Sequence, residues 1–266
     1  MSKYLVACDL DNTLLTDKKQ ISKKSLKFIR KFVARGNYFV ICTGRPISSA
    51  IDFYNVINLD MPVISDNGGL ITFPMKNEKI EFAIDLKLFK ELLTKTDEYI
   101  ITAFCNSKEK LFIQNRPDVP KWLMHYLPET QIIEGHLLDI IDINPLLPNI
   151  WVKDGCYDNF IEVLDGYKDE IGYRYWGFYV GRHSFELFST KASKGLAMNY
   201  LKELYNCDTT IAFGDQFNDS SMIEMADIGV AMINSIDELK QIAKHITKKD
   251  YNHNGVIHFL KKNKLY

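Results

Sequence analysis

The chain has 266 residues, 46% of them hydrophobic and 25% charged, with a formal net charge of −1, which is typical of a globular protein and gives no overall bias toward nucleic acid or an anionic membrane. Its five cysteines form no C-x-x-C pair, so a zinc or redox centre is not expected, and no apolar run approaches the length that spans a membrane. An odd number of cysteines without a leader segment fits a reducing compartment, and we expect a cytoplasmic protein.

A buried strand is predicted over residues 3–9, and it runs directly into acidic residues. Asp9 and Asp11 stand two residues apart at its end. Because successive strand residues alternate between faces, both carboxylates are expected on the same side of the sheet. Two carboxylates this close repel each other unless a cation or a proton lies between them. The segment therefore suits metal-assisted chemistry on an anion.

Strands and helices alternate in the residues that follow. Apolar residues at helical spacing, short buried runs and turn residues predict each element. The predicted elements are a helix over 22–35, a strand over 38–43, a helix over 46–57, a strand over 62–65, and hairpin strands over 70–73 and 80–83. This alternation implies parallel strands joined by right-handed crossovers.

Residues 83–182 differ in character from the segments on either side, since the predicted elements are shorter and more aromatic. They are helices over 86–99 and 157–170 and strands over 100–104, 111–114, 150–153 and 172–175. We expect a separate α+β unit inserted into the first one. A cluster of aromatic residues is expected to form the core of that unit, namely Tyr173, Tyr175, Trp176, Phe178 and Tyr179. The alternative is that one of these rings faces the substrate.

From residue 183 the first pattern returns. The predicted elements are a helix over 194–204, a strand over 209–213, a helix over 219–225, a strand over 228–231 and a helix over 235–244. The last helix starts with Ser235 and has Glu238 three residues later, which predicts a capping box. The expected fold class is α/β, with a Rossmann-like parallel-sheet core of residues 1–82 and 183–266 and an inserted α+β domain of residues 83–182.

Several polar groups fall at the ends of these elements, where open parallel sheets bind their ligands. They are Asp9 with Asp11, Thr43-Gly44-Arg45, Lys194-Gly195, and the turn Gly214-Asp215-Gln216-Phe217-Asn218-Asp219. A strand followed by Thr-Gly is common, and a lysine at a helix start is more often solvated than functional. The acidic turn is more specific, because it adds acids to a sheet edge that already has two.

The chemistry that suits this set is phosphoryl transfer. A carboxylate can attack phosphorus to give an acyl-phosphate, and a divalent cation must then offset the repulsion between the two anions. Asp9 and Asp215 could offer carboxylates to Mg²⁺, and the loop at Asp11 a backbone carbonyl. Thr43 and Lys194 would hold the phosphoryl oxygens. Asp11, kept partly protonated, could donate to the leaving oxygen and later activate water.

The combined motifs resemble those of the haloacid dehalogenase (HAD) superfamily. They are, in order, Asp9-Leu-Asp11-Asn-Thr, Thr43-Gly-Arg, Lys194-Gly and Gly-Asp215-x-x-Asn218-Asp219. The large insert resembles the type C2 cap of the Cof-like phosphatases of subfamily IIB. The likeness covers the whole chain, including the turn over 65–69 and the segment over 254–256.

This resemblance implies a role for each matching residue. Asp9 would be the nucleophile and Asp11 the general acid/base. The implied metal ligands for Mg²⁺ are Asp9, Asp11, Asp215 and Asp219. The implied substrate-binding residues are Thr43, Gly44, Arg45, Asn67, Lys194 and Asn218. Lys194 is preferred over Lys191 because Lys-Gly before an apolar helix is the family pattern.

The implied function is Mg²⁺-dependent hydrolysis of phosphate monoesters on small metabolites through an aspartyl-phosphate. Sugar phosphates and phosphorylated cofactors, such as flavin or pyridoxal phosphates, are the implied substrate classes. Two alternatives remain open: a phosphomutase or phosphotransferase, and a non-catalytic metabolite-binding protein. The expected partner is a small phosphorylated molecule, with neither nucleic acid nor membrane, bound by a monomer or a small homo-oligomer.

Overall fold

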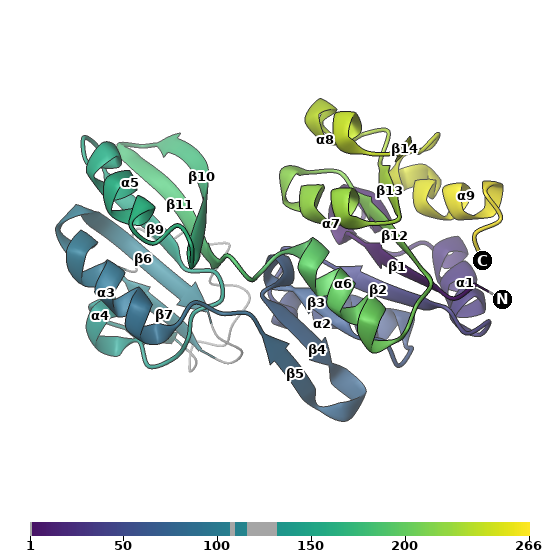
Figure 1. Cartoon of the computed structure of the whole chain (residues 1–266), viewed down its shortest axis with the longest axis horizontal. Coiled ribbons are helices and arrows are strands. Elements are labelled where there is room, and N and C mark those ends of the chain that lie inside the picture. The colour runs from purple at the N-terminus through teal and green to yellow at the C-terminus, as the bar shows by residue number, and fades with distance from the viewer. Residues whose placement is uncertain (1, 107–109, 116–131) are drawn as a thin grey trace. The chain divides into compact units, whose positions relative to one another are not determined.

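The computed structural model describes residues 2–106, 110–115 and 132–266, which form two compact units (Figure 1). The core unit consists of the residues up to Ile80 together with Ser193–Tyr266, and the inserted unit is Glu81–Ala192. The sequence pattern predicts that the insert ends at residue 182. The structure extends it to Ala192, because strand β11 (Arg182–Ser189) pairs on both sides with strands of the inserted unit.

The core unit contains an eight-stranded sheet in the order β14-β13-β12-β1-β2-β3-β4-β5. Its strands are β1 (Tyr4–Cys8), β2 (Tyr38–Cys42), β3 (Val63–Ser65), β4 (Leu70–Phe73), β5 (Glu78–Glu81), β12 (Thr209–Gly214), β13 (Ile228–Ala231) and β14 (His245–Ile246). The neighbours from β14 to β3 are all parallel, and β4 turns back antiparallel to β3. The predicted α/β class with a parallel sheet is confirmed.

Helices of the core unit cover both faces of this sheet (Figure 1). They are α1 (Lys23–Val33), α2 (Ile47–Ile57), α6 (Lys194–Leu204), α7 (Ser220–Met225), α8 (Asp237–Ile242) and α9 (Gly255–Lys262). Helices α1, α2 and α9 share one apolar cluster with the strand face that carries Val6 and Cys8. Helix α1 begins after Ser22, whose side chain accepts a hydrogen bond from the N–H of Ser25.

The capping box predicted at Ser235 is wrong. Helix α8 begins at Asp237, and its N-cap is Ile236, which has no capping side chain. The N–H of Ser235 donates to the carbonyl of Met232, and the N–H of Ile236 donates to the carbonyl of Asp215. These bonds make residues 232–236 a turn tied to the loop after β12, so the helix starts later than the sequence pattern indicates.

The inserted unit has a six-stranded sheet of its own in the order β10-β11-β9-β6-β7-β8. Besides β11, its strands are β6 (Ile100–Asn106), β7 (Leu111–Gln114), β8 (Ile132–Glu134), β9 (Asn149–Lys153) and β10 (Ile171–Tyr179), and its helices are α3 (Leu86–Thr96), α4 (Leu137–Ile140) and α5 (Tyr157–Asp165). Residues of the sheet and of these helices form a separate apolar core.

The aromatic residues of β10 are exposed, so the prediction that they form the core of the inserted unit is wrong. Their exposed fractions run from 37% for Tyr173 to 73% for Tyr179. The reason is topological, since β10 is an edge strand and its core contacts come from Ile171 near its start. Within the part of the chain that the structure describes, no helix has the length and apolarity needed to cross a bilayer.

Candidate active site

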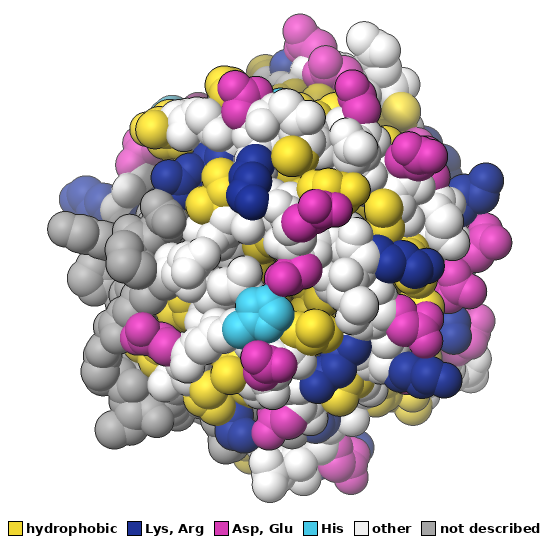
Figure 2. All heavy atoms as spheres, turned by 90° about the vertical axis from the view of Figure 1, so that its left-hand side faces the viewer, with side chains coloured by type: hydrophobic (Ala, Val, Ile, Leu, Met, Phe, Trp, Pro, Cys, Tyr) yellow, Lys and Arg dark blue, Asp and Glu magenta, His cyan; other side chains and the backbone are white. Residues whose placement is uncertain are grey.

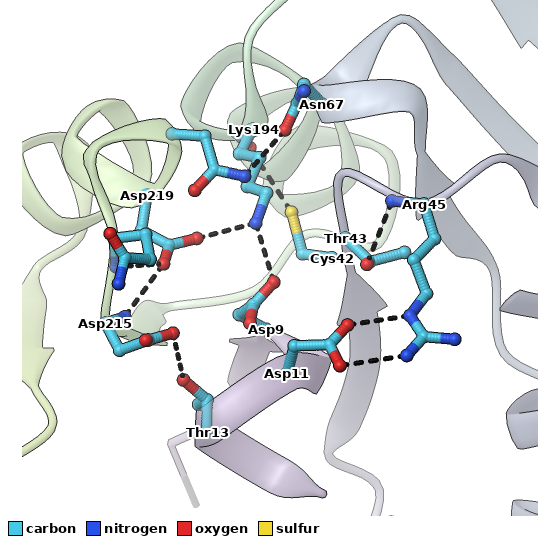
Figure 3. A network of polar contacts seen from close by, with 12 residues as sticks. Asp9, Asp11, Thr13, Cys42, Thr43, Arg45, Asn67, Lys194, Asp215 and Asp219 are labelled. Carbon is cyan, nitrogen blue, oxygen red and sulfur yellow. Dashed lines mark hydrogen bonds and ion pairs between the residues drawn. The ribbon is translucent and has the colours of Figure 1, made fainter. Parts of the chain in front are cut away.

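The structure brings together side chains from the carboxyl ends of four core strands and from the start of α6 (Figure 3). Asp9 follows β1, Thr43 follows β2, Asn67 lies in the turn after β3, Asp215 follows β12, and Lys194 is the first residue of α6. Because these strands are parallel, their carboxyl ends meet at one edge of the sheet. The residues singled out by sequence therefore share one site.

Lys194 lies at the centre of the network with a fully buried side chain. Its Nζ donates to Asp9 Oδ1 at 2.7 Å and to Asp219 Oδ1 at 2.6 Å. Burial lowers the pKa of the ammonium, but the two carboxylates outweigh it and raise the pKa well above its usual range. Lys191, the alternative considered from sequence, is exposed. Lys194 is therefore a permanent buried cation within contact of Asp9.

Three buried carboxylates, from Asp9, Asp215 and Asp219, each place an oxygen within 4.8 Å of the others. When all three are ionised beside the Lys194 ammonium, two negative charges are left in a buried site, and a divalent cation would balance them. All the donors are oxygens, as Mg²⁺ prefers. The donor set and its charge therefore fit Mg²⁺.

The hydrogen bonds of these three acids indicate two different roles, which are to hold a cation and to position neighbouring groups. Asp219 Oδ2 accepts from the backbone N–H groups of Asp215 (2.8 Å) and Gln216 (3.0 Å), while its Oδ1 accepts from Lys194. Asp219 thus fixes the loop and the lysine. Asp215 Oδ1 accepts from the hydroxyl of Thr13 at 3.2 Å. Asp9 and Asp215 are the residues that would hold the cation.

Burial and crowding shift the acid pKa values upward. Burial raises the pKa of Asp9 to about 8, with Lys194 opposing the shift and Asp219 adding to it. Burial and the neighbouring Asp219 raise the pKa of Asp215 to about 6. The site therefore binds protons when it holds no cation.

These shifts predict that the metal-free protein loses stability as the pH rises. Between the ordinary and the raised pKa values, the folded state holds more protons than the unfolded chain, so the free energy of unfolding falls with pH. We expect a decline from about pH 4 to about pH 6 for Asp215 and to about pH 8 for Asp9, of up to about 1.4 kcal/mol per pH unit for each group. Urea unfolding in chelator at each pH measures it.

Two comparisons complete that test. Asp9→Asn removes one of the titrating groups, so its slope should be shallower than that of the wild type. Mg²⁺ competes with protons for the same oxygens and should also reduce the slope. Equal slopes for wild type and variant in chelator would contradict the assignment of the decline to Asp9.

Asp11 is oriented away from the acid cluster and toward Arg45 (Figure 3), and Lys19 is its second cationic partner. Arg45 donates to both of its oxygens, from Nε at 2.7 Å and from Nη2 at 2.8 Å, and Lys19 Nζ lies 2.7 Å from Oδ1. Burial raises the pKa of Asp11, but these partners outweigh it and lower the pKa to about 2. The expectation that the site keeps Asp11 partly protonated is therefore wrong for the free protein.

The expected common direction of Asp9 and Asp11 also fails, for a local reason. Strand β1 ends at Cys8, and residues Leu10–Leu14 form a π-helical turn in which Asn12 has a left-handed backbone with φ of 55°. Strand alternation no longer applies after Cys8. The Asp11 carboxylate therefore has different partners from that of Asp9, and it does not join the cluster predicted to hold metal.

Two residues of the site, Lys19 and Thr13, are not among those predicted from the sequence. Lys19 lies at the tip of the hairpin bridged by Leu15 and Ile21, with a left-handed φ of 52°. Only the folded hairpin places this lysine against Asp11. One feature of the sequence could have identified Thr13 as a site residue, namely its position within the motif that begins at Asp9.

The side of the site near Thr43 offers neutral hydrogen-bonding groups. Thr43 is buried, and its hydroxyl oxygen accepts from the N–H of Arg45 at 3.2 Å. Asn218 Nδ2 donates to Asn67 Oδ1 at 2.8 Å. A Cβ on Gly44 would lie 2.8 Å from that same Oδ1. Gly44 therefore lets the two amides lie directly over the backbone that follows β2.

The turn after β3 supports the site through Gly68. Gly68 has a φ of +94°, and a Cβ there would lie 2.2 Å from the carbonyl of Ser193, immediately before Lys194. Gly68→Ala should lower the free energy of unfolding by about 1 kcal/mol from the backbone conformation and by a further ~1–3 kcal/mol from the collision. It should also lower turnover, because the start of α6 carries Lys194.

Gly36 is a matched control for that prediction. Its φ is +88°, but a Cβ there would meet nothing within 4 Å. Gly36→Ala should therefore show the backbone penalty alone, with turnover unchanged. Thermal unfolding and steady-state kinetics of both variants make the comparison, and equal losses of stability would disprove the contact between the turn and α6.

The chain is similar to known proteins in its sequence. A sequence profile described as haloacid dehalogenase-like hydrolase matches residues 6–260. The chain is 29% identical to the Bacillus subtilis 5-amino-6-(5-phospho-D-ribitylamino)uracil phosphatase YitU, over 97% of this chain and 96% of that protein. It is 31% identical to a Streptococcus pyogenes protein whose name describes it as a phosphatase, over 98% of each chain.

Solved structures share the fold over the whole chain. TM0651 from Thermotoga maritima superposes with a TM-score of 0.80 at 24% identity, covering 98% of this chain and 97% of that one. The HAD subclass IIB sugar phosphatase BT4131 superposes with a TM-score of 0.74 at 17% identity, covering all of both chains. At these identities the likeness establishes the fold.

Proposed function

Because the chain belongs to the haloacid dehalogenase-like hydrolases, we propose that it is a Mg²⁺-dependent phosphatase that cleaves phosphate monoesters of small metabolites through an aspartyl-phosphate on Asp9. The observation that carries the proposal is the buried contact of Asp9 with Lys194, beside Asp215 and Asp219. The name of the Bacillus subtilis relative, which is a phosphatase of a phosphorylated ribitylaminouracil, supports a small phosphorylated metabolite as the substrate.

Asp9 is the proposed nucleophile that attacks phosphorus. Lys194 holds its Oδ1, which leaves Oδ2 as the attacking atom. In the first step a bond forms between this oxygen and phosphorus while the ester P–O bond breaks. Lys194 and the hydroxyl of Thr43 would bind the phosphoryl oxygens. Asp9 and Asp215 would hold Mg²⁺, which would offset the repulsion between carboxylate and phosphate.

Asp11 is the proposed general acid and base, and its two cationic partners determine whether its carboxyl group is ionised. In the free protein Arg45 and Lys19 keep it ionised. An arriving phosphate dianion competes for these cations and adds negative charge, and both effects raise the pKa of Asp11. Asp11 would then donate a proton to the leaving oxygen and recover one from the water that hydrolyses the aspartyl-phosphate.

The inserted unit is the proposed cap that selects the substrate and excludes water during the reaction. Water is the proposed acceptor of the phosphoryl group, and a sugar hydroxyl is the alternative. We propose that the enzyme works in the cytoplasm, as a monomer or small homo-oligomer. The cysteines support this compartment, since all five are free.

Phosphate release from a panel of phosphorylated metabolites tests the proposal. The panel should include sugar phosphates and phosphorylated cofactors, each assayed with Mg²⁺ and with chelator. We expect free phosphate from at least one class, and loss of turnover in chelator. Isomerised sugar phosphate without free phosphate would identify a mutase, and binding without turnover across the panel would favour a metabolite-binding protein.

A further inference from the structure

Helix α1 presents an unbroken positive surface. None of its eleven residues is acidic, and five are basic, namely Lys23, Lys24, Lys27, Arg30 and Lys31. A sixth basic residue, Arg35, follows the end of the helix. All six side chains are exposed. The chain as a whole has a net charge of only −1. By contrast, the face in Figure 2 mixes acidic and basic side chains with hydrophobic ones.

Two hollows flank this surface, and they share Lys27 and Lys31. One has a volume of about 380 Å³ and is also lined by Lys23, Leu26 and Arg30. The other, of about 270 Å³, is lined further by Lys24, Phe28, Phe32, Arg35, Lys261 and Tyr266. No acidic side chain lines either hollow. We name the residues of the two hollows together the α1 basic surface.

Three lysines lie at the centre of the α1 basic surface. Among the residues that the structure describes, Lys24, Lys27 and Lys31 form no ion pair. Arg30, in contrast, is committed to the fold, because its guanidinium donates to the carbonyls of Val56 and Ile57 at the end of α2. The lysines are therefore available to an anion.

The positive field continues onto the adjacent part of α9. The pKa of His258 is lowered, first by burial and then by four nearby lysines: Lys249, Lys262, Lys24 and Lys248. Lys248 likewise lowers the pKa of Lys262. Like charges crowded in this way repel each other, and a bound polyanion would relieve that repulsion.

The aromatic rings of the α1 basic surface already have cations over them. Lys261 lies 5.5 Å from the ring centroid of Phe28, and the guanidinium of Arg35 lies 4.9 Å from that of Tyr266. The rings of Tyr266 and Phe28 also pack in a T-shaped pair, and Phe32 is buried. Nucleic-acid bases need open ring faces for stacking. The surface thus suits phosphate groups without bases.

We propose that the α1 basic surface binds a linear chain of phosphate groups, namely inorganic polyphosphate. Lys24, Lys27 and Lys31 fall on one stripe of the helix and span about 10 Å at the helical rise of ~1.5 Å per residue. Because hollows lie on both sides of the Lys27–Lys31 pair, an extended ligand that crosses the helix is favoured and a compact ligand is not. This binding is independent of the proposed phosphatase activity.

Titration with sodium polyphosphate tests the inference, in chelator so that the active site cannot turn it over. The affinity should fall steeply with salt, because bound phosphates release counter-ions. Lys27→Glu with Lys31→Glu should weaken binding by about tenfold or more and make the salt dependence shallower by about two charges. Phosphate release from metabolites by this variant should match that of the wild type.

A matched pair on α3 controls for total charge. Lys87→Glu with Lys90→Glu makes the same charge change on a helix of the inserted unit, and it should leave polyphosphate binding unchanged. Equal weakening by both pairs, or no binding by the wild type, would overturn the inference. The inference would also be overturned if a single-stranded RNA of equal charge bound as tightly as polyphosphate, or if the protein bound only anionic phospholipid vesicles.

Discussion

Asp9→Asn is expected to lower kcat for phosphate release by roughly a thousandfold or more, as removal of a nucleophile does in other covalent enzymes. The amide lacks the charge that attacks phosphorus, while it keeps the size of the carboxyl group. Lys194 retains its contact with Asp219 in this variant. The loss should therefore fall on turnover, and steady-state kinetics with the best substrate of the panel measure it.

A control separates this loss from a general effect of removing an acid. Asp52 is exposed on α2, so Asp52→Asn should leave kcat near the wild-type value. Circular dichroism should show the wild-type fold for both variants. If Asp9→Asn kept turnover within about tenfold of the wild type, the covalent role of Asp9 would be excluded.

Lys194→Met should be the most destabilising single substitution in the site. It leaves Asp9 and Asp219 buried beside each other without their cation, and loss of one partner of a buried ion pair costs about 3–5 kcal/mol. Turnover should also be lost, since the phosphoryl group loses a ligand. Urea unfolding in chelator near neutral pH gives the change in unfolding free energy.

Lys191→Met is the matched control, because Lys191 is an exposed lysine three residues before Lys194. Lys191→Met should change the free energy of unfolding by no more than about 0.5 kcal/mol, as most surface substitutions do. Mg²⁺ should recover part of the stability of Lys194→Met, since a cation again balances the acids. A stability close to the wild type for Lys194→Met in chelator would show that the buried ion pairs contribute little.

Residues whose position follows from strand ends could be identified from sequence. Asp9, Thr43 and Asp215 follow short apolar runs, and parallel strands bring such positions to one edge. The bounds of α6 and β13 also match their predictions, because the side chain of Ser193 caps the start of α6 and β13 is a short apolar run. In these places local pattern and tertiary structure agree, so a single sequence suffices.

Other features depend on contacts that no local pattern encodes. The direction of Asp11 is set by the π-helical turn and by Arg45, which is distant in sequence. The ionisation of Asp11 follows from the same contacts. Strand β11 belongs to the inserted unit because of its pairing with β9 and β10, and its own sequence did not mark the boundary.

The most direct test of the central claim is to trap the phosphorylated enzyme. Wild-type protein with Mg²⁺ and its best substrate would be quenched in acid during turnover, digested, and analysed by peptide mass spectrometry. We predict a phosphoryl group on the peptide that contains Asp9, located on that residue and removed by hydroxylamine as an acyl-phosphate requires. A phosphoryl group on another residue, or unmodified enzyme throughout steady turnover, would contradict the account.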